Sequence, residues 1–388
     1  MSERVDIVIV GGAAVGASTA WHLACWYGAE TRIVVIEKDP SYARAATALS
    51  ASSIRRQFSA AINVRVSGYG VALLRAAPRL FGFDPTFREG GYLFLATEAG
   101  RAALTANHAT ALAEGADIAW LETADLAARF PWLNTEGIAA GTFGRSGEGW
   151  FDGFGLAQAM RARSREAGVA WRTGEVAAID TEGERVRGVV LADGERIAAA
   201  RVIVCAGCDT PALLAPFLAV PVRRRKRMIF FLRCPDPLAG LPLLIDPSGA
   251  YLRPEGEGFI CGASPPPDED PDVAAEDFDL IDGFFEERVW APIAARVPAL
   301  ERIRLERAWA GHYDFNTFDH NALIGPIPGV SGLFAACGFS GHGLQQAPST
   351  GRGLAELALW GRYVAMDLSP LGFDRLADGR RVEERAVV

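Results

Sequence analysis

The stretch Val5–Ser18, VDIVIVGGAAVGAS, combines a strand, a glycine turn and the start of a helix. Its apolar run Val5–Val10 is typical of a strand that is buried on both faces. The turn follows G-x-G-x-x-G, except that Ala13 stands at the middle glycine. In such a turn the first glycine makes the bend, the second admits a pyrophosphate, and the third lets the helix pack on the strand. Gly11 and Gly16 take the first and third roles, so the stretch predicts a dinucleotide turn with one extra methyl group.

The residues that follow complete a βαβ unit. We expect a helix over Val15–Tyr27, ended by Gly28, and then a second buried strand, Arg32–Glu37. Glu37 ends that strand, where an acidic side chain accepts the ribose hydroxyls of a dinucleotide and disfavours a 2′-phosphate. The alternative is a tight turn in an unrelated α/β protein.

Composition limits the class of protein. With 388 residues, the chain is long enough for two domains or one elaborated α/β unit. Its net charge of −8 offers no basic field to nucleic acid. The strand-like start predicts no signal peptide, and no apolar run approaches the ~20 residues of a membrane span. The six cysteines do not suggest a disulfide scaffold, so we expect a cytoplasmic protein.

The rest of the chain predicts separated nucleotide-type strands with antiparallel material between them. Strands of the buried parallel type occur at the start, near 202 (RVIVCAG) and near 333 (LFAAC). We expect helices over 59–80, 99–113, 155–167, 279–296 and 347–360, a β-meander over 171–198, antiparallel strands at 223–232, 250–254 and 259–263, and an exposed loop at 264–272 (SPPPDEDPD). One domain built from separated segments, with a second domain inserted, explains this order.

A second glycine-rich loop, GFSGHG, lies between the last buried strand and the last helix. Gly338, Gly341 and Gly343 bring backbone N–H groups toward a ligand, and the helix N-terminus behind them favours negative charge. A reduced flavin carries such charge at its N1–C2 carbonyl edge. The alternative is a flexible glycine-rich connection.

Several motifs in order resemble those of one enzyme family. GGAAVG…IEKD, SASSIRRQF, REGGYLFLAT, VIVCAG, WAGHYDFNTFDHNALIG and GFSGHG are similar to the D-amino-acid oxidase superfamily of FAD enzymes. The nearest branches are sarcosine oxidase, D-arginine dehydrogenase and the FAD-dependent oxidoreductase domain-containing proteins. The resemblance implies an α/β fold, in part α+β, with a discontinuous Rossmann-type FAD-binding domain and an inserted antiparallel-sheet substrate domain. We expect the FAD-binding domain at 1–85, 150–215 and 323–388, and the substrate domain at 86–149 and 216–322.

The resemblance also assigns residues to the cofactor. The turn would face the pyrophosphate, Glu37 the ribose, the 50–53 segment the pyrophosphate and flavin ring, and the GFSGHG loop the ring. The implied FAD-binding residues are Gly11, Ala13, Ala14, Val15, Gly16, Glu37, Lys38, Ser50, Ala51, Ser52, Ser53, Val176 (adenine), Ala206, Gly207, Gly338, Phe339, Ser340, Gly341, His342, Gly343, Leu344 and Gln345.

Departures from the family pattern are informative. Monomeric sarcosine oxidases tether FAD through a cysteine near the segment WAGHYDF, where this chain has His312 and Tyr313, so we expect noncovalent FAD. They also place a lysine over the flavin on the strand that matches 259–262. This strand has none, and the chain has only two lysines, Lys38 and Lys226. Gln345 stands where a lysine of the family pairs with the substrate carboxylate.

Five residues remain as candidates for catalysis and substrate binding. Arg55 and Arg227 match carboxylate-binding arginines of two branches, and a guanidinium binds both carboxylate oxygens. Tyr251 and Tyr313 match positions that face the substrate, and a protonated His342 could replace the missing lysine. The alternatives are that Arg55 is solvated and that VRRRKR, which contains Arg227, is an edge strand of surface charge.

We therefore expect FAD-dependent oxidation of a C–N bond in an amino acid or N-alkyl amino acid. Hydride would pass from the α-carbon to flavin N5, and water would hydrolyse the imine. The absent lysine favours a dehydrogenase with an electron-acceptor partner over an oxidase. The alternatives are a low-turnover flavoprotein that acts in assembly or partner binding, and an NAD-linked dehydrogenase.

Overall fold

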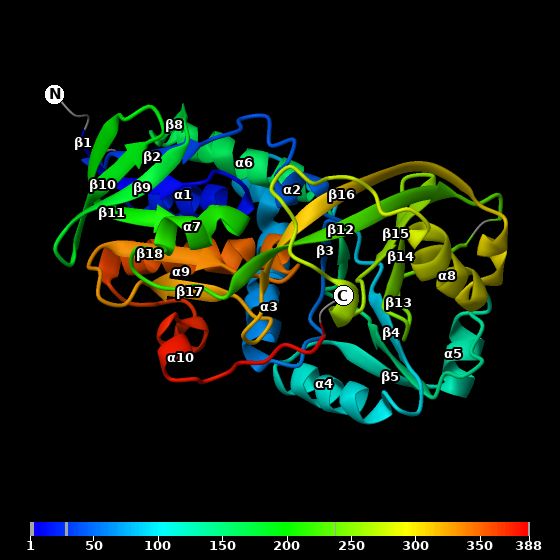
Figure 1. Ribbon diagram of the computed structural model, residues 1–388. Coiled ribbons are helices and arrows are strands. Elements are labelled where there is room, and N and C mark those ends of the chain that lie inside the picture. The colour runs from blue at the N-terminus through cyan, green and yellow to red at the C-terminus, as the bar shows by residue number, and fades with distance from the viewer. Residues whose placement is uncertain (1–3, 28–29, 237, 387–388) are drawn as a thin grey trace.

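Two sheets form the framework of the protein (Figure 1). The computed structural model describes residues 4–27, 30–236 and 238–386, so the predicted helix stop at Gly28 lies outside the described residues. One sheet has the order β17-β18-β11-β1-β2-β8, with β10 and β9 added beside β11. The other has the order β16-β12-β15-β14-β13-β4-β6-β5.

The first sheet joins strands from distant parts of the chain. β1 (Arg4–Val10) pairs in parallel with β2 (Ile33–Glu37) and with β11 (Arg196–Val204), which in turn pairs in parallel with β18 (Leu333–Cys337). This confirms the prediction of buried parallel strands at the start, near 202 and near 333. Ile7 and Ile9 pack on one face with side chains of helices α1 (Ala14–Tyr27) and α9 (Gly343–Trp360).

The second sheet is mostly antiparallel and carries its own core. It consists of β16 (Arg304–Asn316), β12 (Val222–Arg233), β15 (Gly258–Ala263), β14 (Ala250–Glu255), β13 (Leu243–Ile245), β4 (Tyr92–Ala96), β6 (Ala140–Gly144) and β5 (Ile118–Glu122). Phe230, Leu252 and Cys261 lie on the face that packs against α8 (Ala291–Arg296). Because alternate side chains of a strand face opposite sides, Ile229, Phe231 and Ile260 lie on the other face, beside Ala51.

The remaining elements connect and cover the two sheets. They are α2 (Ala46–Leu49), β3 (Ser53–Ile54), α3 (Ala61–Phe81), α4 (Arg101–Ala113), α5 (Thr123–Arg129), β7 (Gly149–Trp150), α6 (Gly153–Glu166), α7 (Thr210–Leu214) and α10 (Asp374–Ala377). The first sheet is completed by β8 (Ala170–Thr173), β9 (Val176–Glu182), β10 (Arg185–Leu191) and β17 (Leu323–Pro326). In Figure 1 the long helix α3 stands between the two sheets, and the chain after α10 runs back to the middle of the molecule.

Two local predictions need correction, and a third is refined. The helix expected over 279–296 begins only with a π-helical turn, Phe285–Trp290, because Gly283 has a φ of +74° that interrupts a right-handed helix. The last helix begins at Gly343 rather than at 347. The run VRRRKR is an edge on one side, because it pairs with β16 while β15 reaches β12 only at Ile229–Leu232, but Arg227 within it is buried rather than solvated.

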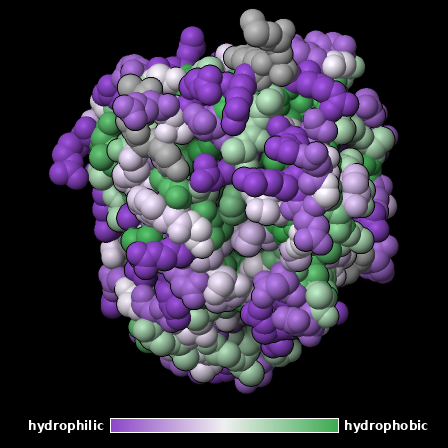
Figure 2. Space-filling view, turned by 90° about the vertical axis from the view of Figure 1, so that its left-hand side faces the viewer, coloured by the Kyte–Doolittle hydropathy of each residue, from purple (hydrophilic) through white to green (hydrophobic). Residues whose placement is uncertain are grey.

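The strands of the two sheets fall in the two predicted sets of ranges, while the domain boundaries themselves stay a prediction. Among the described residues, no helix is long and apolar enough to cross a membrane. On the face of the molecule shown in Figure 2, hydrophilic side chains are interspersed with smaller hydrophobic areas.

Candidate functional site

The glycine turn after β1 is as tight as its sequence suggests. Gly11 has a φ of +90°, and a Cβ there would lie 2.5 Å from the carbonyl oxygen of Cys205. A Cβ at Gly16 would lie 1.9 Å from the carbonyl oxygen of Gly11. Both positions therefore require glycine, whereas Ala13 is half-exposed at the start of α1 and its methyl group is accommodated.

Glu37 fastens this turn to the end of β2. Its Oε2 accepts a hydrogen bond from the Gly12 N–H at 2.7 Å, and its Oε1 accepts one from the Asp39 N–H at 2.8 Å. Each carboxylate oxygen keeps a second lone pair for a ligand. Lys38 forms an ion pair with Asp209, which lies two residues after the predicted pyrophosphate residue Gly207. Val176, predicted at the adenine, is buried at the start of β9.

The segment Ser50–Ser53 crosses between the two sheets. Arg253 of β14 donates from Nε to the carbonyl of Ala51 at 3.0 Å, and the Ser52 N–H donates to Oγ of Ser50 at 3.0 Å. Ser52 has a φ of +50°, which is strained for a residue with a side chain. The second sheet thus holds the segment in a fixed and unusual conformation.

The GFSGHG loop is held by Asp314 of β16. Oδ2 of Asp314 accepts from the Gly338 N–H at 2.7 Å, and its carbonyl accepts from the Ser340 N–H at 3.1 Å. Burial raises the pKa of Asp314 to about 6. Gly341 has a φ of +91°, and a Cβ there would lie 2.5 Å from the ring of Tyr313. The loop therefore packs closely on one predicted substrate residue.

The structure brings the two glycine loops together. Ala14, near the start of α1, packs in one cluster with Ala347 of α9, and Val15 and Leu344 lie against it. The helix α9 begins without a side-chain cap, since His342 at its start makes no capping hydrogen bond. Free N–H groups of the first turn thus remain beside the loop. Phe339 is buried in the core below.

Arg55 is buried rather than solvated, with 3% of its surface exposed. Its guanidinium donates to the carbonyl oxygens of Gln57 and Ala386, and its Nη2 donates to Nε2 of His342 at 2.8 Å. Its backbone N–H donates to Oε1 of Gln345 at 3.0 Å. The predicted carboxylate anchor is therefore engaged by the C-terminal segment of the same chain.

His342 does not supply a cation in place of the missing lysine. Burial, followed by the positive charge of Arg55, lowers the pKa of His342 to about 3. The imidazole is therefore neutral near pH 7. Its Nδ1 is buried and has no hydrogen-bond partner among the described residues.

Arg227 lies at the same site as Tyr313. The guanidinium carbon of Arg227 is 5.3 Å from the centroid of the Tyr313 ring, and the charges of Arg227 and Arg55 both act on that ring. Burial raises the pKa of Tyr313 and, more strongly, that of Tyr251. The hydroxyl of Tyr251 points over Gly262, where a Cβ would lie 2.6 Å from it.

Three acidic residues near the site escaped the sequence analysis. Asp270 pairs with Arg227, so the acidic loop 264–272 is only partly exposed. Glu384 accepts from Ser59, Ala60 and Asn63 and leads the chain toward Arg55. Glu148 is fully buried, and burial raises its pKa to about 7. Glu148 is a single acidic residue in the turn SGEGW, and nothing in that sequence indicates that it is buried or that its pKa is raised.

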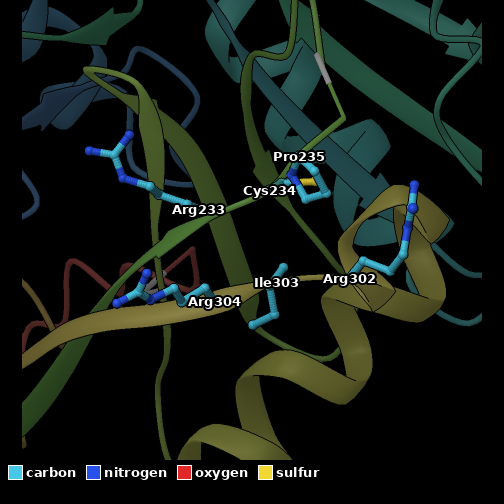
Figure 3. Close-up of a pocket in the computed structure, with 6 residues that line it drawn as sticks. All are labelled: Arg233, Cys234, Pro235, Arg302, Ile303 and Arg304. Atoms are coloured by element: carbon cyan, nitrogen blue, oxygen red, sulfur yellow. The ribbon is translucent and has the colours of Figure 1, made fainter.

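A surface pocket elsewhere is unrelated to these residues. It lies at the other end of β12 from Val222, where Figure 3 shows Arg302 extending away from Arg233 and Arg304. Arg233 pairs with Glu257 and Glu306, and Arg302 pairs with Asp236, so both charges are already neutralised.

The parallel sheet with its two glycine loops, joined to a second antiparallel sheet, is the architecture of an FAD-dependent oxidoreductase. The family model described as FAD dependent oxidoreductase (DAO) matches residues 6–357, and the chain belongs to this family. Its cofactor is accordingly FAD.

Individual relatives agree with this class. FAD-dependent oxidoreductase domain-containing protein 1 from Bos taurus is 36% identical over an alignment that covers 100% of this chain and 87% of that protein. Glycine oxidase from Geobacillus kaustophilus is 26% identical, covering 97% of this chain and 98% of that protein. Among solved structures, L-proline dehydrogenase from P. horikoshii matches with a TM-score of 0.87 and 25% identity, covering 98% of this chain and 100% of that one.

Proposed function

We propose that this chain oxidises the C–N bond of an amino acid or N-alkyl amino acid. When bound, FAD supplies the acceptor for the hydride of the α-carbon, and water hydrolyses the imine that results. The relatives named above include enzymes whose names specify glycine and proline. The remaining question is which side chains bind the cofactor and the substrate.

The residues present fit a bound FAD. Gly11 and Gly16 permit a tight turn, Glu37 has free lone pairs, and α9 begins without a side-chain cap. Nδ1 of His342 is a buried polar atom that lacks a partner within the described chain, and a ligand would satisfy it. We therefore propose that the family-implied residues given above contact FAD and that the contact is noncovalent. His312, the other candidate for a tether, hydrogen-bonds the carbonyl of Asp277.

One observation carries the proposal for the substrate. Tyr313 packs on the glycine loop, and the charges of both Arg55 and Arg227 act on it. Two guanidinium groups beside one tyrosine at the predicted flavin ring suit a substrate with a carboxylate. The amine would bind deprotonated, so no strong general base is needed, and Tyr251 would cover the substrate.

The same surroundings favour a dehydrogenase over an oxidase. The strand Phe259–Gly262 carries no charge, and His342 is neutral. Lys226 pairs with Asp277 at 2.6 Å on the face of β12 opposite Arg227. Reduced flavin would then pass electrons to a quinone, a dye or a partner flavoprotein.

The test is an anaerobic screen of amino acids, N-methyl amino acids and simple amines, read by loss of the yellow flavin absorbance. Bleaching by a carboxylate-bearing amine supports the proposal, and bleaching only by simple amines would remove the anchoring role of the arginines. A flavin that no amine reduces would favour the second candidate, a low-turnover flavoprotein of assembly or partner binding. One observation supports that candidate, since both arginines already have partners in the chain. The NAD-linked alternative gains no support.

A further inference from the structure

The acidic segment 268–277 wraps around an open edge of β12. β12 pairs with β15 only from Ile229 to Leu232, so no strand of the described chain pairs with residues 222–228 on that side. There the Val273 N–H donates to the carbonyl of Arg224 at 3.1 Å. The segment crosses the open edge at this bond and passes from one face of the sheet to the other.

Ion pairs attach the segment on both faces. On the face that carries Tyr313, Asp270 pairs with Arg227, and Asp272 lies 3.3 Å from Arg225. On the opposite face, Asp277 pairs with Lys226. The basic run VRRRKR therefore serves as the docking strip of the acidic segment.

The contact between Arg227 and Asp270 differs from the others. Nη1 and Nη2 of Arg227 donate to the two carboxylate oxygens of Asp270 at 2.7 and 2.9 Å. The two side chains are only 8% and 10% exposed, while Nε of Arg227 is buried with no partner in the described part of the chain. Asp270 thus holds Arg227 in the two-pronged geometry of a ligand carboxylate but leaves one donor unused.

The segment is also weakly anchored otherwise. Among residues 264–283 whose burial is described, none is fully buried. Segments with few buried apolar contacts open at low cost in free energy. If a ligand replaces the acidic side chains in these ion pairs, little hydrophobic packing opposes movement of the segment into water.

We infer that residues 268–277 form a lid over the substrate site, and that the carboxylate of Asp270 occupies Arg227 until a ligand carboxylate replaces it. The inference rests on the proposed function for its substrate class. It also predicts a specificity for ligands with a carboxylate. A neutral ligand cannot replace the carboxylate of Asp270, so Arg227 stays paired with Asp270.

The experiment titrates the FAD-loaded protein with benzoate and with benzamide, its neutral analogue, and follows the flavin absorbance spectrum. Asp270→Asn removes the carboxylate that competes for Arg227. It should tighten benzoate binding by about tenfold or more, because benzoate no longer has to displace a charged partner before it binds. Benzamide binding should not change. Asp268→Asn, an exposed acid of the same segment, is the matched control and should leave both affinities unchanged.

Hydrogen exchange of the wild-type protein gives a reading that needs no variant. Benzoate should speed exchange of the Val273 N–H and its neighbours, whereas benzamide should not. Three outcomes would each overturn the lid. The wild type and Asp270→Asn could bind benzoate with affinities within twofold of each other, or benzoate could leave the flavin spectrum of both proteins unchanged. Benzoate could also slow hydrogen exchange at the Val273 N–H.

The two proposals fail in different ways. If no amine reduces the flavin, the proposed reaction fails, but benzoate can still displace Asp270. If amino acids reduce the flavin while benzoate leaves Asp270 in place, the reaction stands and the lid alone is wrong.

Discussion

Nη2 of Arg55 donates to Nε2 of His342 across 2.8 Å inside the protein. A guanidinium has only donors, so Nε2 must accept and the imidazole proton must lie on Nδ1. The pair thereby fixes one tautomer of His342, whose Nδ1–H has no hydrogen-bond partner among the described residues. Arg55 acts here by orienting a neighbour, in addition to any contact with a substrate.

His342 should therefore remain neutral across the physiological range. The chain has five histidines, and burial lowers the pKa of both His22 and His342 to about 3. In a ¹⁵N-imidazole titration from pH 5 to 8, these two should keep the signals of a neutral ring. A His342 that titrates near its ordinary pKa of about 6.5 would contradict the assigned tautomer.

A lysine introduced on the face of β15 that lies beside Ala51, the proposed flavin side, should speed the reaction with oxygen. Ile260 lies beside Ala51 on that face, whereas Cys261 lies in the core of the second sheet. Ile260→Lys should therefore accelerate reoxidation of the reduced protein in aerated buffer, with release of hydrogen peroxide. Ile260→Met is the control for size. Wild-type reoxidation as fast as turnover would mean that the protein is already an oxidase. Cys261→Lys should instead destabilise the fold, because it buries an ammonium group.

Glu37→Ala should weaken retention of FAD. The change removes an acceptor of ribose hydroxyls and the two hydrogen bonds that fasten the turn, and charge-assisted bonds contribute roughly 1.5–3 kcal/mol, or about ten- to a hundredfold in affinity. Ala13→Gly should retain FAD or bind it slightly tighter. Equilibrium dialysis measures both. Loss of FAD from Ala13→Gly but not from Glu37→Ala would show that the phosphate turn is misplaced.

Acid or heat should release the flavin into the supernatant. The segment WAGHYDF holds His312 and Tyr313 but no cysteine, and His312 lies on the sheet face that carries Lys226. Its ring is 4.2 Å from that of Phe278 and bonds Asp277. Yellow colour that stays with the precipitated polypeptide would reveal a covalent bond, and mass spectrometry of flavin peptides would then locate it.

Glu148 should make the stability of the protein depend on pH. Burial raises its pKa from 4.5 to about 7, so between these values the folded state binds more protons than the unfolded state. This stabilisation is complete below pH 4.5 and is lost as the pH rises to 7, by up to about 3 kcal/mol. Thermal unfolding midpoints should fall over this range in the wild type and fall less in Glu148→Gln. Parallel curves for the two proteins would exclude Glu148 as the cause.

The sequence was sufficient for the sheet that carries the two glycine loops. Runs such as Val5–Val10 and Leu333–Cys337 are apolar on both faces, and turns that need Gly11 and Gly16 leave few alternatives. Both signals are local. The order of strands in the second sheet needed the structure, because β4 reaches β13 across a long separation in sequence.

The polar contacts of the site were less predictable. The family motifs single out Arg55 and Arg227, but motifs do not reveal that Ala386 and Asp270 bind them. Each of these contacts joins residues far apart in the chain, and a single exposed acid looks the same in sequence whether it is solvated or paired. Sequence could not decide for the same reason whether His342 is protonated, since its pKa depends on burial and on Arg55.

The path of the last residues has a practical consequence for handling the protein. Arg375 and Asp319 form a fully buried ion pair, Asp319 also accepts from the Val382 N–H, and the chain then delivers Glu384 and Ala386 to the interior of the molecule. Because the Ala386 carbonyl accepts from Arg55, a fusion partner attached to this segment would disturb the surroundings of the predicted carboxylate anchor. Fusion partners should therefore be placed before Arg4, at the exposed start of β1.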